Sequence, residues 1–255
     1  MKTALITGAS FGLGFEFADI FAKEKYNLVI VARNKEKLED VALELRKKYG
    51  IEVTIIVADL SNVNSPKRIY DEISEKGIKI DVLVNNAGSG KYGFFADSQD
   101  ASSIDMINLN ITSVTLLTKY FLTDMVKRHS GKILIVSSIG AFQPNPFGSV
   151  YGATKAYELL LAESLSGELI NSGVTISALC PGPTKTEFAT RAGKKDAKFA
   201  MDARTVALEG YKGMMQGKLI IIPSIKYKIE VFLAKLLPAK IIASYVGKWQ
   251  QSLKN

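Results

Sequence analysis

The sequence contains only one cysteine, Cys180, and only one histidine, His129. A lone cysteine excludes an internal disulfide and suits a reducing compartment. No secretory signal is visible near the start, and no apolar run reaches the roughly 18 residues of a membrane-spanning helix. Internal repeats, linkers and low-complexity segments are absent as well. We therefore expect a cytoplasmic globular protein, and no metal site is predicted.

Basic residues outnumber acidic ones. The chain has 33 Lys and Arg residues and 25 Asp and Glu residues, which give a formal net charge of +8. A positive protein attracts anionic partners such as phosphorylated cofactors, acyl-carrier proteins or anionic lipid. The basic residues form no dense block with interleaved aromatics, so no nucleic-acid partner is predicted. A length of 255 residues, 47% of them hydrophobic, is enough for one domain with a full core.

Short apolar runs rich in β-branched residues alternate with longer helical patterns. The runs are 3–7, 27–32, 53–58, 81–86, 132–138, 174–180 and 219–223. Such alternation is typical of a parallel sheet with helices on both faces, and continuous apolar runs suit strands that are buried on both sides. The sequence thus predicts the α/β class: a single doubly wound (Rossmann-type) domain over residues 1–255, with a mostly seven-stranded parallel sheet.

Ligands of such sheets bind at the carboxyl ends of the strands, so the residues after each run are informative. The first run is followed by TGASFGLGFEFA, in which Gly8, Gly12 and Gly14 lead into a helical pattern. Glycines let the backbone approach a pyrophosphate at a helix N-terminus. A glycine triplet can also be a plain strand–helix turn, but its place after the first strand favours dinucleotide binding.

The second run ends in VARN, at a place where enzymes that use NAD usually carry an acidic residue. Here Arg33 follows the run. A charge-assisted bond from arginine to a 2′-phosphate is worth about 1.5–3 kcal/mol, or roughly 10- to 150-fold in affinity. The alternative is an exposed arginine that caps a strand. The missing acid and the added base together favour NADP(H).

Polar residues follow other runs: Asp59 in ADL, the segment NNAG at 85–88, and the serine pair 137–138. Each could be a capping or turn residue, but a parallel sheet would bring them all to one edge. Tyr151 and Lys155 lie four residues apart in YGATK and therefore share a helix face. A cation within about 4–6 Å lowers a tyrosine pKa by about 1–3 units, which would prepare Tyr151 for acid–base chemistry.

Over residues 1 to about 224, the sequence resembles the short-chain dehydrogenase/reductase family. The motifs that carry the resemblance are TGASFGLG, NNAG, Asn110 in INLNIT, Ser138, YGATK and PGPTKTEF. The resemblance implies an NADP(H)-dependent oxidoreductase with Tyr151 as general acid/base. Ser138, thirteen residues before Tyr151 as the family pattern requires, is preferred to Ser137 for holding the substrate carbonyl. Lys155 would also bind the nicotinamide ribose, and Asn110 would anchor a water of the proton relay.

The resemblance also implies which residues bind the cofactor. They are Gly8, Ser10, Phe11, Gly12, Leu13, Gly14, Arg33, Asp59, Leu60, Asn86, Ala87, Gly88, Tyr151, Lys155, Pro181, Gly182, Thr184 and Thr186. Family members commonly assemble through the helices expected at about 112–129 and 151–170, so a homodimer or homotetramer is expected. A nucleotide-binding regulator with little turnover is the alternative function, although the complete catalytic set favours an enzyme.

The segments expected to line the substrate pocket carry Phe94, Phe95, Phe142, Phe147 and Phe188. Some of these phenylalanines are expected to be ordinary core residues, but together they favour a small hydrophobic ketone or a 3-oxoacyl compound as substrate. Residues 225–255 form a basic amphipathic extension of the same domain, interrupted at Pro238. Such a tail packs on the protein itself, covers a pocket, contacts a partner subunit or lies on a membrane surface. Packing on the protein's own body is the leading interpretation, and among the functional roles a cover or a subunit contact is favoured over the membrane.

The substitution Arg33→Asp tests the cofactor prediction. It removes a cation and adds a repulsive charge, so the affinity for NADPH relative to NADH should fall by at least about tenfold. Calorimetric titration of both cofactors measures this ratio. An unchanged ratio would show that the phosphate is bound elsewhere, for example near Ser10.

Overall fold

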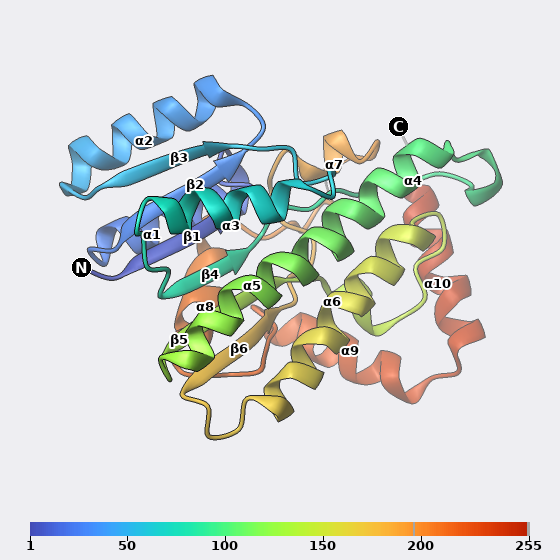
Figure 1. The fold of residues 1–255 in the computed structure, drawn as a ribbon. Helices are drawn as coiled ribbons and strands as arrows, with labels where there is room; N and C mark the ends of the chain where they lie inside the picture. The colour runs from blue at the N-terminus through green and yellow to red at the C-terminus, as the bar shows by residue number, and fades with distance from the viewer. Residues whose placement is uncertain (196, 254–255) are drawn as a thin grey trace.

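The computed structural model describes residues 1–195 and 197–253 of the chain. Seven parallel strands form one sheet in the order β3-β2-β1-β4-β5-β6-β7, and helices cover both of its faces (Figure 1). The strands are β1 (Thr3–Thr7), β2 (Asn27–Ala32), β3 (Val53–Val57), β4 (Val82–Asn85), β5 (Gly131–Val136), β6 (Val174–Leu179) and β7 (Ile220–Ile221).

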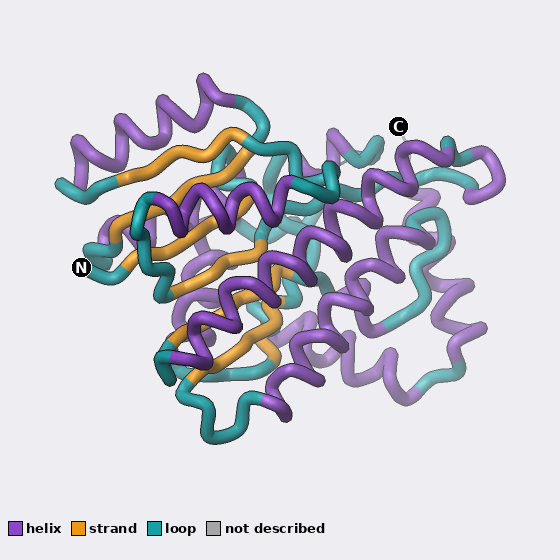
Figure 2. Tube along the Cα trace, viewed as in Figure 1, coloured by secondary structure: helices purple, strands orange, loops and turns teal. Residues whose placement is uncertain are grey.

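Helices connect the strands and continue beyond the last one (Figure 2). The α-helices are α1 (Gly12–Lys23), α2 (Lys35–Tyr49), α3 (Ser65–Glu75), α4 (Asp100–Ile107), α5 (Ser113–Lys127), α6 (Ser149–Glu168), α7 (Phe188–Arg191), α8 (Ala203–Met215), α9 (Ile225–Leu236) and α10 (Ala239–Ser252). The connections also contain the 3₁₀ turns η1 (Phe95–Asp97) and η3 (Ile139–Phe142) and the π-helix η2 (Asn108–Thr112). None of the helices described has the length and hydropathy needed to cross a bilayer.

Side chains along the inner strands alternate between two apolar cores, as the period of a β-strand requires. Ala4 and Ile6 of β1 pack in one core with Phe17 and Phe21 of α1, and α2 and α8 complete that layer. Leu5 packs in the other core, which α3, α5 and α6 cover. Both faces of the sheet are therefore buried, which explains why the strands are continuous apolar runs.

The predicted fold class is confirmed, and every predicted run contains a strand. Several strands end earlier than predicted. The fourth is Val82–Asn85 instead of 81–86, and the last is Ile220–Ile221 instead of 219–223. In the fourth, the backbone N–H of Asn86 leaves the ladder and donates to Thr7 Oγ1 at 3.0 Å. The polar residues that follow β4 therefore belong to the loop at the carboxyl edge of the sheet.

The turn between β1 and α1 depends on glycine. Gly8 and Gly12 have φ angles of +68° and +57°, in the region that favours glycine. Gly14 lies in the first turn of α1, where a Cβ atom would stand 2.1 Å from the carbonyl oxygen of Gly8. The start of the helix therefore packs directly against the loop before it.

The tail forms two helices that pack on the domain. Pro238 is the N-cap of α10 and separates it from α9. Tyr227 and Val231 of α9 and Ile242 and Val246 of α10 are buried. The inner faces of both helices therefore belong to the body of the protein.

A pair of helical glycines gives a matched test of this packing. Gly14→Ala should lower the free energy of unfolding by about 1–3 kcal/mol, because the methyl group overlaps the Gly8 carbonyl. Gly167 lies in α6, and a Cβ atom there would have no neighbour within 4 Å. Gly167→Ala should therefore raise the free energy of unfolding by about 0.4–1 kcal/mol. Urea unfolding measures both changes, and equal changes would contradict the packing.

Candidate active site

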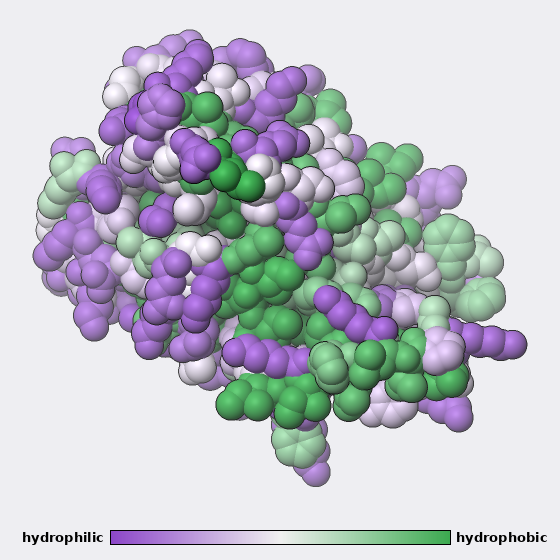
Figure 3. Space-filling model, turned by 90° about the horizontal axis from the view of Figure 1, so that it is seen from below, coloured by the Kyte–Doolittle hydropathy of each residue, from purple (hydrophilic) through white to green (hydrophobic). Residues whose placement is uncertain are grey.

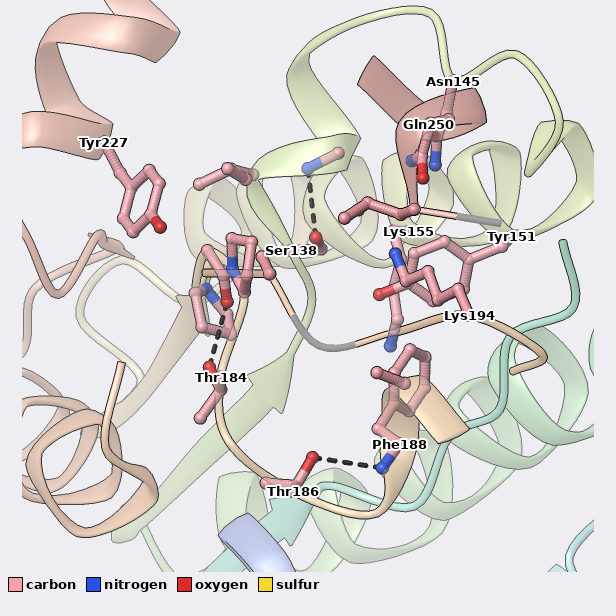
Figure 4. A pocket seen from close by; sticks show the side chains of 18 of the residues that line it. Ser138, Asn145, Tyr151, Lys155, Thr184, Thr186, Phe188, Lys194, Tyr227 and Gln250 are labelled. Atoms are coloured by element: carbon pink, nitrogen blue, oxygen red, sulfur yellow. Dashed lines mark hydrogen bonds between the residues drawn. The ribbon is translucent and has the colours of Figure 1, made fainter. Parts of the chain in front are cut away.

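A cavity of about 760 Å³ opens at the carboxyl edge of the sheet, within the size range of small-molecule sites. Its walls come from the loop after β1, the ends of β4 and β5, the start of α6, the loop after β6, and the tail helices. Figure 4 shows side chains from several of these segments around one space: Ser138 after β5, Tyr151 of α6, Thr184 after β6, and Tyr227 and Gln250 of the tail helices. Segments far apart in the sequence therefore share one cavity.

Ser138 and Tyr151 lie on the same wall. The Ser138 hydroxyl accepts a hydrogen bond from the Gly140 N–H at 3.0 Å (Figure 4). Tyr151, near the start of α6, is only 8% exposed, and the ring of Phe188 lies 5.5 Å from its ring centroid. The neighbouring Ser137 hydroxyl is buried and donates to the Lys155 carbonyl at 2.8 Å. Ser138 is thus the serine whose hydroxyl remains able to donate into the cavity.

Lys155 already has partners for its three N–H donors. Its Nζ atom donates to the Val136 carbonyl at 2.9 Å and to the two Glu158 carboxylate oxygens at 3.0 and 2.9 Å. Lys155 and Glu158 are 4% and 1% exposed. The sequence analysis did not identify Glu158, although its spacing of three residues from Lys155 places it on the same helix face.

The expected lowering of the Tyr151 pKa by Lys155 is not found. Lys155 Nζ lies 5.9 Å from the centroid of the Tyr151 ring. Burial raises the pKa of Tyr151, a hydrogen bond with Ser138 lowers it, and the Glu158 carboxylate raises it. The largest cause is burial, and the Glu158 carboxylate, which binds Lys155 directly, acts in the same direction. In this structure Tyr151 is therefore a protonated phenol.

Asn110 lies in the π-helix η2, a local irregularity that often marks functional positions. It is fully buried and does not line the cavity. Its carbonyl oxygen accepts from the Ser89 N–H at 3.0 Å, and its amide donates to the Ser89 carbonyl and the Thr154 hydroxyl, each at 2.9 Å. Asn110 thus ties the loop after β4 to α6.

The loop after β1 forms the other end of the cavity, where Gly8, Phe11, Gly12 and Leu13 line it. Phe11, the N-cap of α1, makes no side-chain capping bond, so the first N–H groups of the helix lack a capping side chain. This is the arrangement that binds a phosphate. The residues present therefore fit a dinucleotide.

The segment NNAG differs from the prediction in one respect. Asn86, Ala87 and Gly88 line the cavity, but the Asn86 amide donates to the carbonyls of Thr7 and Gly8 at 2.9 and 3.3 Å. This amide was expected to contact the cofactor, and it instead supports the glycine loop. Buried backbone carbonyls need partners, and Asn86 supplies them.

Several predicted cofactor residues do not line the cavity: Ser10, Gly14, Arg33, Asp59 and Leu60. Arg33 and Asp59 lie beyond the ends of β2 and β3, with side chains 68% and 48% exposed and an Nη1–Oδ2 distance of 3.8 Å. Asp59 also accepts hydrogen bonds from the N–H and hydroxyl of Ser61. The Arg33 guanidinium is thus exposed, with a weak surface partner.

The loop after β6 and the tail complete the cavity. Pro181, Gly182, Thr184 and Thr186 all line it. A Cβ atom at Gly182 would stand 2.3 Å from the ring of Tyr227 on α9, so this glycine permits the tail to approach.

Gln250 of α10 is a cavity residue that the sequence analysis did not find. It is 6% exposed, and its Nε2 donates to Asn145 Oδ1 at 2.9 Å (Figure 4). Its Oε1 has no hydrogen-bond partner among the described residues. Oε1 itself is buried, and the side chain of Gln250 also interacts with Tyr92, so Gln250 joins α10 to the loop after β4.

The predicted phenylalanine lining is largely wrong. Of the five, only Phe188 lines the cavity. Phe94 and Phe95 are 60% and 64% exposed, and Phe142 packs against the core beneath α6. Other aromatics line the cavity instead: Phe11, Tyr92, Phe199, Tyr227, Tyr245 and Trp249.

Known proteins are similar to this chain in sequence and in fold. A family model described as short chain dehydrogenase matches residues 2–197. "Very-long-chain 3-oxoacyl-CoA reductase" from Anas platyrhynchos is 38% identical over 184 residues, 70% of this chain and 58% of that protein. "Very-long-chain 3-oxoacyl-CoA reductase-B" from Danio rerio is 33% identical over 254 residues, 96% of this chain and 79% of that protein. This chain thus spans little more than half of the first relative.

A solved structure has the same architecture over nearly its whole length. It is a short-chain dehydrogenase from Sphingobium yanoikuyae in complex with NADPH, with a TM-score of 0.85 and 32% sequence identity. The match covers 91% of this chain and 92% of that chain.

The buried carboxyl of Glu158 gives a pH test. Burial raises its pKa from 4.5 to about 7, although Lys155 acts in the opposite direction. A raised pKa means that the folded state binds the proton more tightly than the unfolded state does. This contribution to stability is therefore complete below about pH 4.5 and is lost as the pH rises through about 7.

Glu158→Gln should remove this part of the pH dependence, because glutamine keeps the shape and does not titrate. The free energy of unfolding, measured between about pH 5 and about pH 8, should then change less in the variant than in the wild type. Glu168→Gln, at an exposed position of the same helix, is the control. Equal slopes in all three proteins would contradict the burial argument.

Proposed function

The chain belongs to the short-chain dehydrogenase/reductase family, and on this premise we propose that it is an NADPH-dependent oxidoreductase that acts on the carbonyl of a hydrophobic ketone or 3-oxoacyl compound. One observation carries the proposal. A single cavity joins the glycine loop after β1 to Ser138 and Tyr151. A dinucleotide at the loop and a carbonyl at the tyrosine would therefore meet within it.

The preference for NADPH rests on Arg33. Its exposed guanidinium follows β2, at the place where an adenosine ribose is bound in dinucleotide folds. The contact with Asp59 spans 3.8 Å between exposed side chains, so it competes weakly with a phosphate. The solved relative that carries NADPH supports the same choice.

When bound, the nicotinamide supplies or accepts a hydride. The protonated phenol of Tyr151 is the form that donates a proton to a carbonyl oxygen as it becomes an alkoxide. Ser138 lies on the same wall and can hydrogen-bond that oxygen, which orients the carbonyl. Burial keeps bulk water away from Tyr151, so the proton moves between positioned groups.

Lys155 and Glu158 act as a unit in this proposal. Glu158 of α6 and the Val136 carbonyl of β5 hold the ammonium group of Lys155. Lys155 also lines the cavity. To bind a ribose hydroxyl, Lys155 must give up one contact with Glu158. Protonation of Glu158, whose pKa is raised to about 7, would release that contact.

The substrate class follows from the walls beyond Tyr151. Apolar side chains of the tail line this part, among them Tyr227, Leu233 and Val246. Lys194, Lys195 and Lys198 line the same cavity and would attract an anionic carrier such as a phosphorylated thioester. The names of the two curated relatives support a 3-oxoacyl thioester.

Assembly is a further part of the proposal. Leu160 of α6 is 63% exposed, whereas its neighbour Leu159 is 6% exposed. A second copy would cover Leu160 in a homodimer or homotetramer built on α5 and α6.

Tyr151→Phe tests the function directly. Loss of the hydroxyl should lower kcat/KM by about 10²- to 10⁴-fold, because it removes general acid–base catalysis. NADPH affinity should stay within about twofold, since the phenol hydroxyl is only one of the many groups expected to contact the nucleotide. The assay follows nicotinamide absorbance with a panel of hydrophobic ketones and 3-oxoacyl thioesters.

The same assay separates the enzyme from the alternative. A regulator would bind NADPH and turn over none of the panel. Wild-type turnover in Tyr151→Phe would contradict the assignment of the acid.

A further inference from the structure

The C-terminal helices expose an unusual share of the apolar surface. Nine of the 21 large hydrophobic residues that the described chain leaves exposed lie between residues 225 and 249. Single exposed apolar residues are normal in soluble proteins, but a contiguous group marks an interaction site.

On α9 the exposed residues form a stripe. Ile225, Ile229, Phe232 and Leu236 recur at intervals of four, three and four residues, which keeps them on one helix face. They are 75%, 54%, 62% and 66% exposed. Tyr227 and Val231, which are buried, face the domain from α9. The helix thus has a second apolar face, and more than half of the surface of each of its four residues is exposed in the described part of the chain.

The stripe continues on α10. Ile241 and Tyr245 are 55% and 72% exposed, while the adjacent Ile242 and Val246 are buried. Figure 3, viewed from below, shows hydrophobic side chains gathered on this side of the molecule with hydrophilic ones between and around them. We call the exposed apolar residues of 225–249 the tail face.

Charges around the tail face are of one sign. Five exposed lysines lie on the two helices: Lys226, Lys228, Lys235, Lys240 and Lys248. None of them forms an ion pair with any residue that the structure describes. The acidic residue of α9, Glu230, is half-buried and lines the cavity instead. The tail face therefore presents apolar side chains bordered by unpaired positive charge.

We propose that the tail face docks on an anionic lipid surface. An interfacial helix combines an apolar stripe, which enters the boundary of the acyl chains, with lysines that meet anionic headgroups. A contact between two copies of this chain fits less well, because lysine is depleted in protein interfaces and identical positive rims repel each other. The sequence alone favoured a cover or a subunit contact, and the exposed stripe with its lysines changes that preference.

Docking would also place the cavity next to the lipid. Ile229, Tyr245 and Trp249 line the cavity and are also exposed at the tail face. An apolar substrate dissolved in the bilayer would then meet the cavity without crossing water. This consequence rests on the proposed function, whereas docking itself does not.

The test uses the full chain and vesicles of phosphatidylcholine with or without phosphatidylserine. The protein should sediment with the anionic vesicles, and added salt should release it. Trp249, the single tryptophan, is 38% exposed on α10, so its emission should shift to shorter wavelength on binding. Neither result needs enzyme activity, so failure of docking and failure of the proposed function are distinguishable.

Two double variants separate the charge from the apolar stripe. Lys228→Gln with Lys235→Gln should weaken binding to anionic vesicles about 25-fold, from roughly fivefold per lysine. Phe232→Gln with Leu236→Gln should abolish the Trp249 shift. The matched control is Leu43→Gln with Lys47→Gln on exposed positions of α2, and it should bind as the wild type does. Thermal melting of each variant checks that it is folded.

Three outcomes would overturn the proposal. The first is no binding to anionic vesicles. The second is equal binding by all variants. The third is a dimer in light scattering that Phe232→Gln with Leu236→Gln dissociates, because the tail face would then be an interface between copies.

Discussion

Parallel pairing of β1, β4, β5 and β6 is the constraint on which the candidate site depends. Strands that run in one direction present their carboxyl ends at a single edge, so the loops that follow them must meet. The junction of β1 and β4 is further tied by side chains. Thr7 Oγ1 accepts from the N–H groups of Asn86 and Ala87 at 3.0 and 2.9 Å, and the Asn86 amide donates back to the Thr7 carbonyl at 2.9 Å. The glycine loop therefore has a fixed position relative to the rest of the cavity.

Within that frame, the buried pair of Lys155 and Glu158 sets the electrostatics. Removing two charges from water is costly, and a buried pair seldom adds net stability, but removing one partner leaves a charge that nothing compensates. The pair therefore fixes the direction of the lysine rather than strengthening the fold. It also keeps the phenol of Tyr151 from sensing a free cation, which is why burial dominates the pKa of that group.

The sequence predicted the features that follow from local patterns. Apolar runs located all seven strands, and the glycine spacing located the turn before α1. The sequence did not predict the position of side chains whose contacts depend on residues far away in the chain. The amide of Asn86 serves the loop after β1, and the rings of Phe94 and Phe95 point to solvent. Glu158 had a local signal in its spacing from Lys155. Gln250 had none, because nothing in the sequence tells which face of α10 meets Asn145.

The bond between Gln250 and Asn145 joins residues 105 positions apart, near the end and the middle of the chain. Contacts of such separation form late, since a long loop must close before they are gained. The glycine loop, Ser138 and Tyr151 all precede residue 169, whereas α9 and α10, which complete the cavity, come from residues 225–252. Closure of the cavity therefore depends on contacts between distant parts of the chain, whereas its nucleotide end and its tyrosine come from neighbouring strand ends.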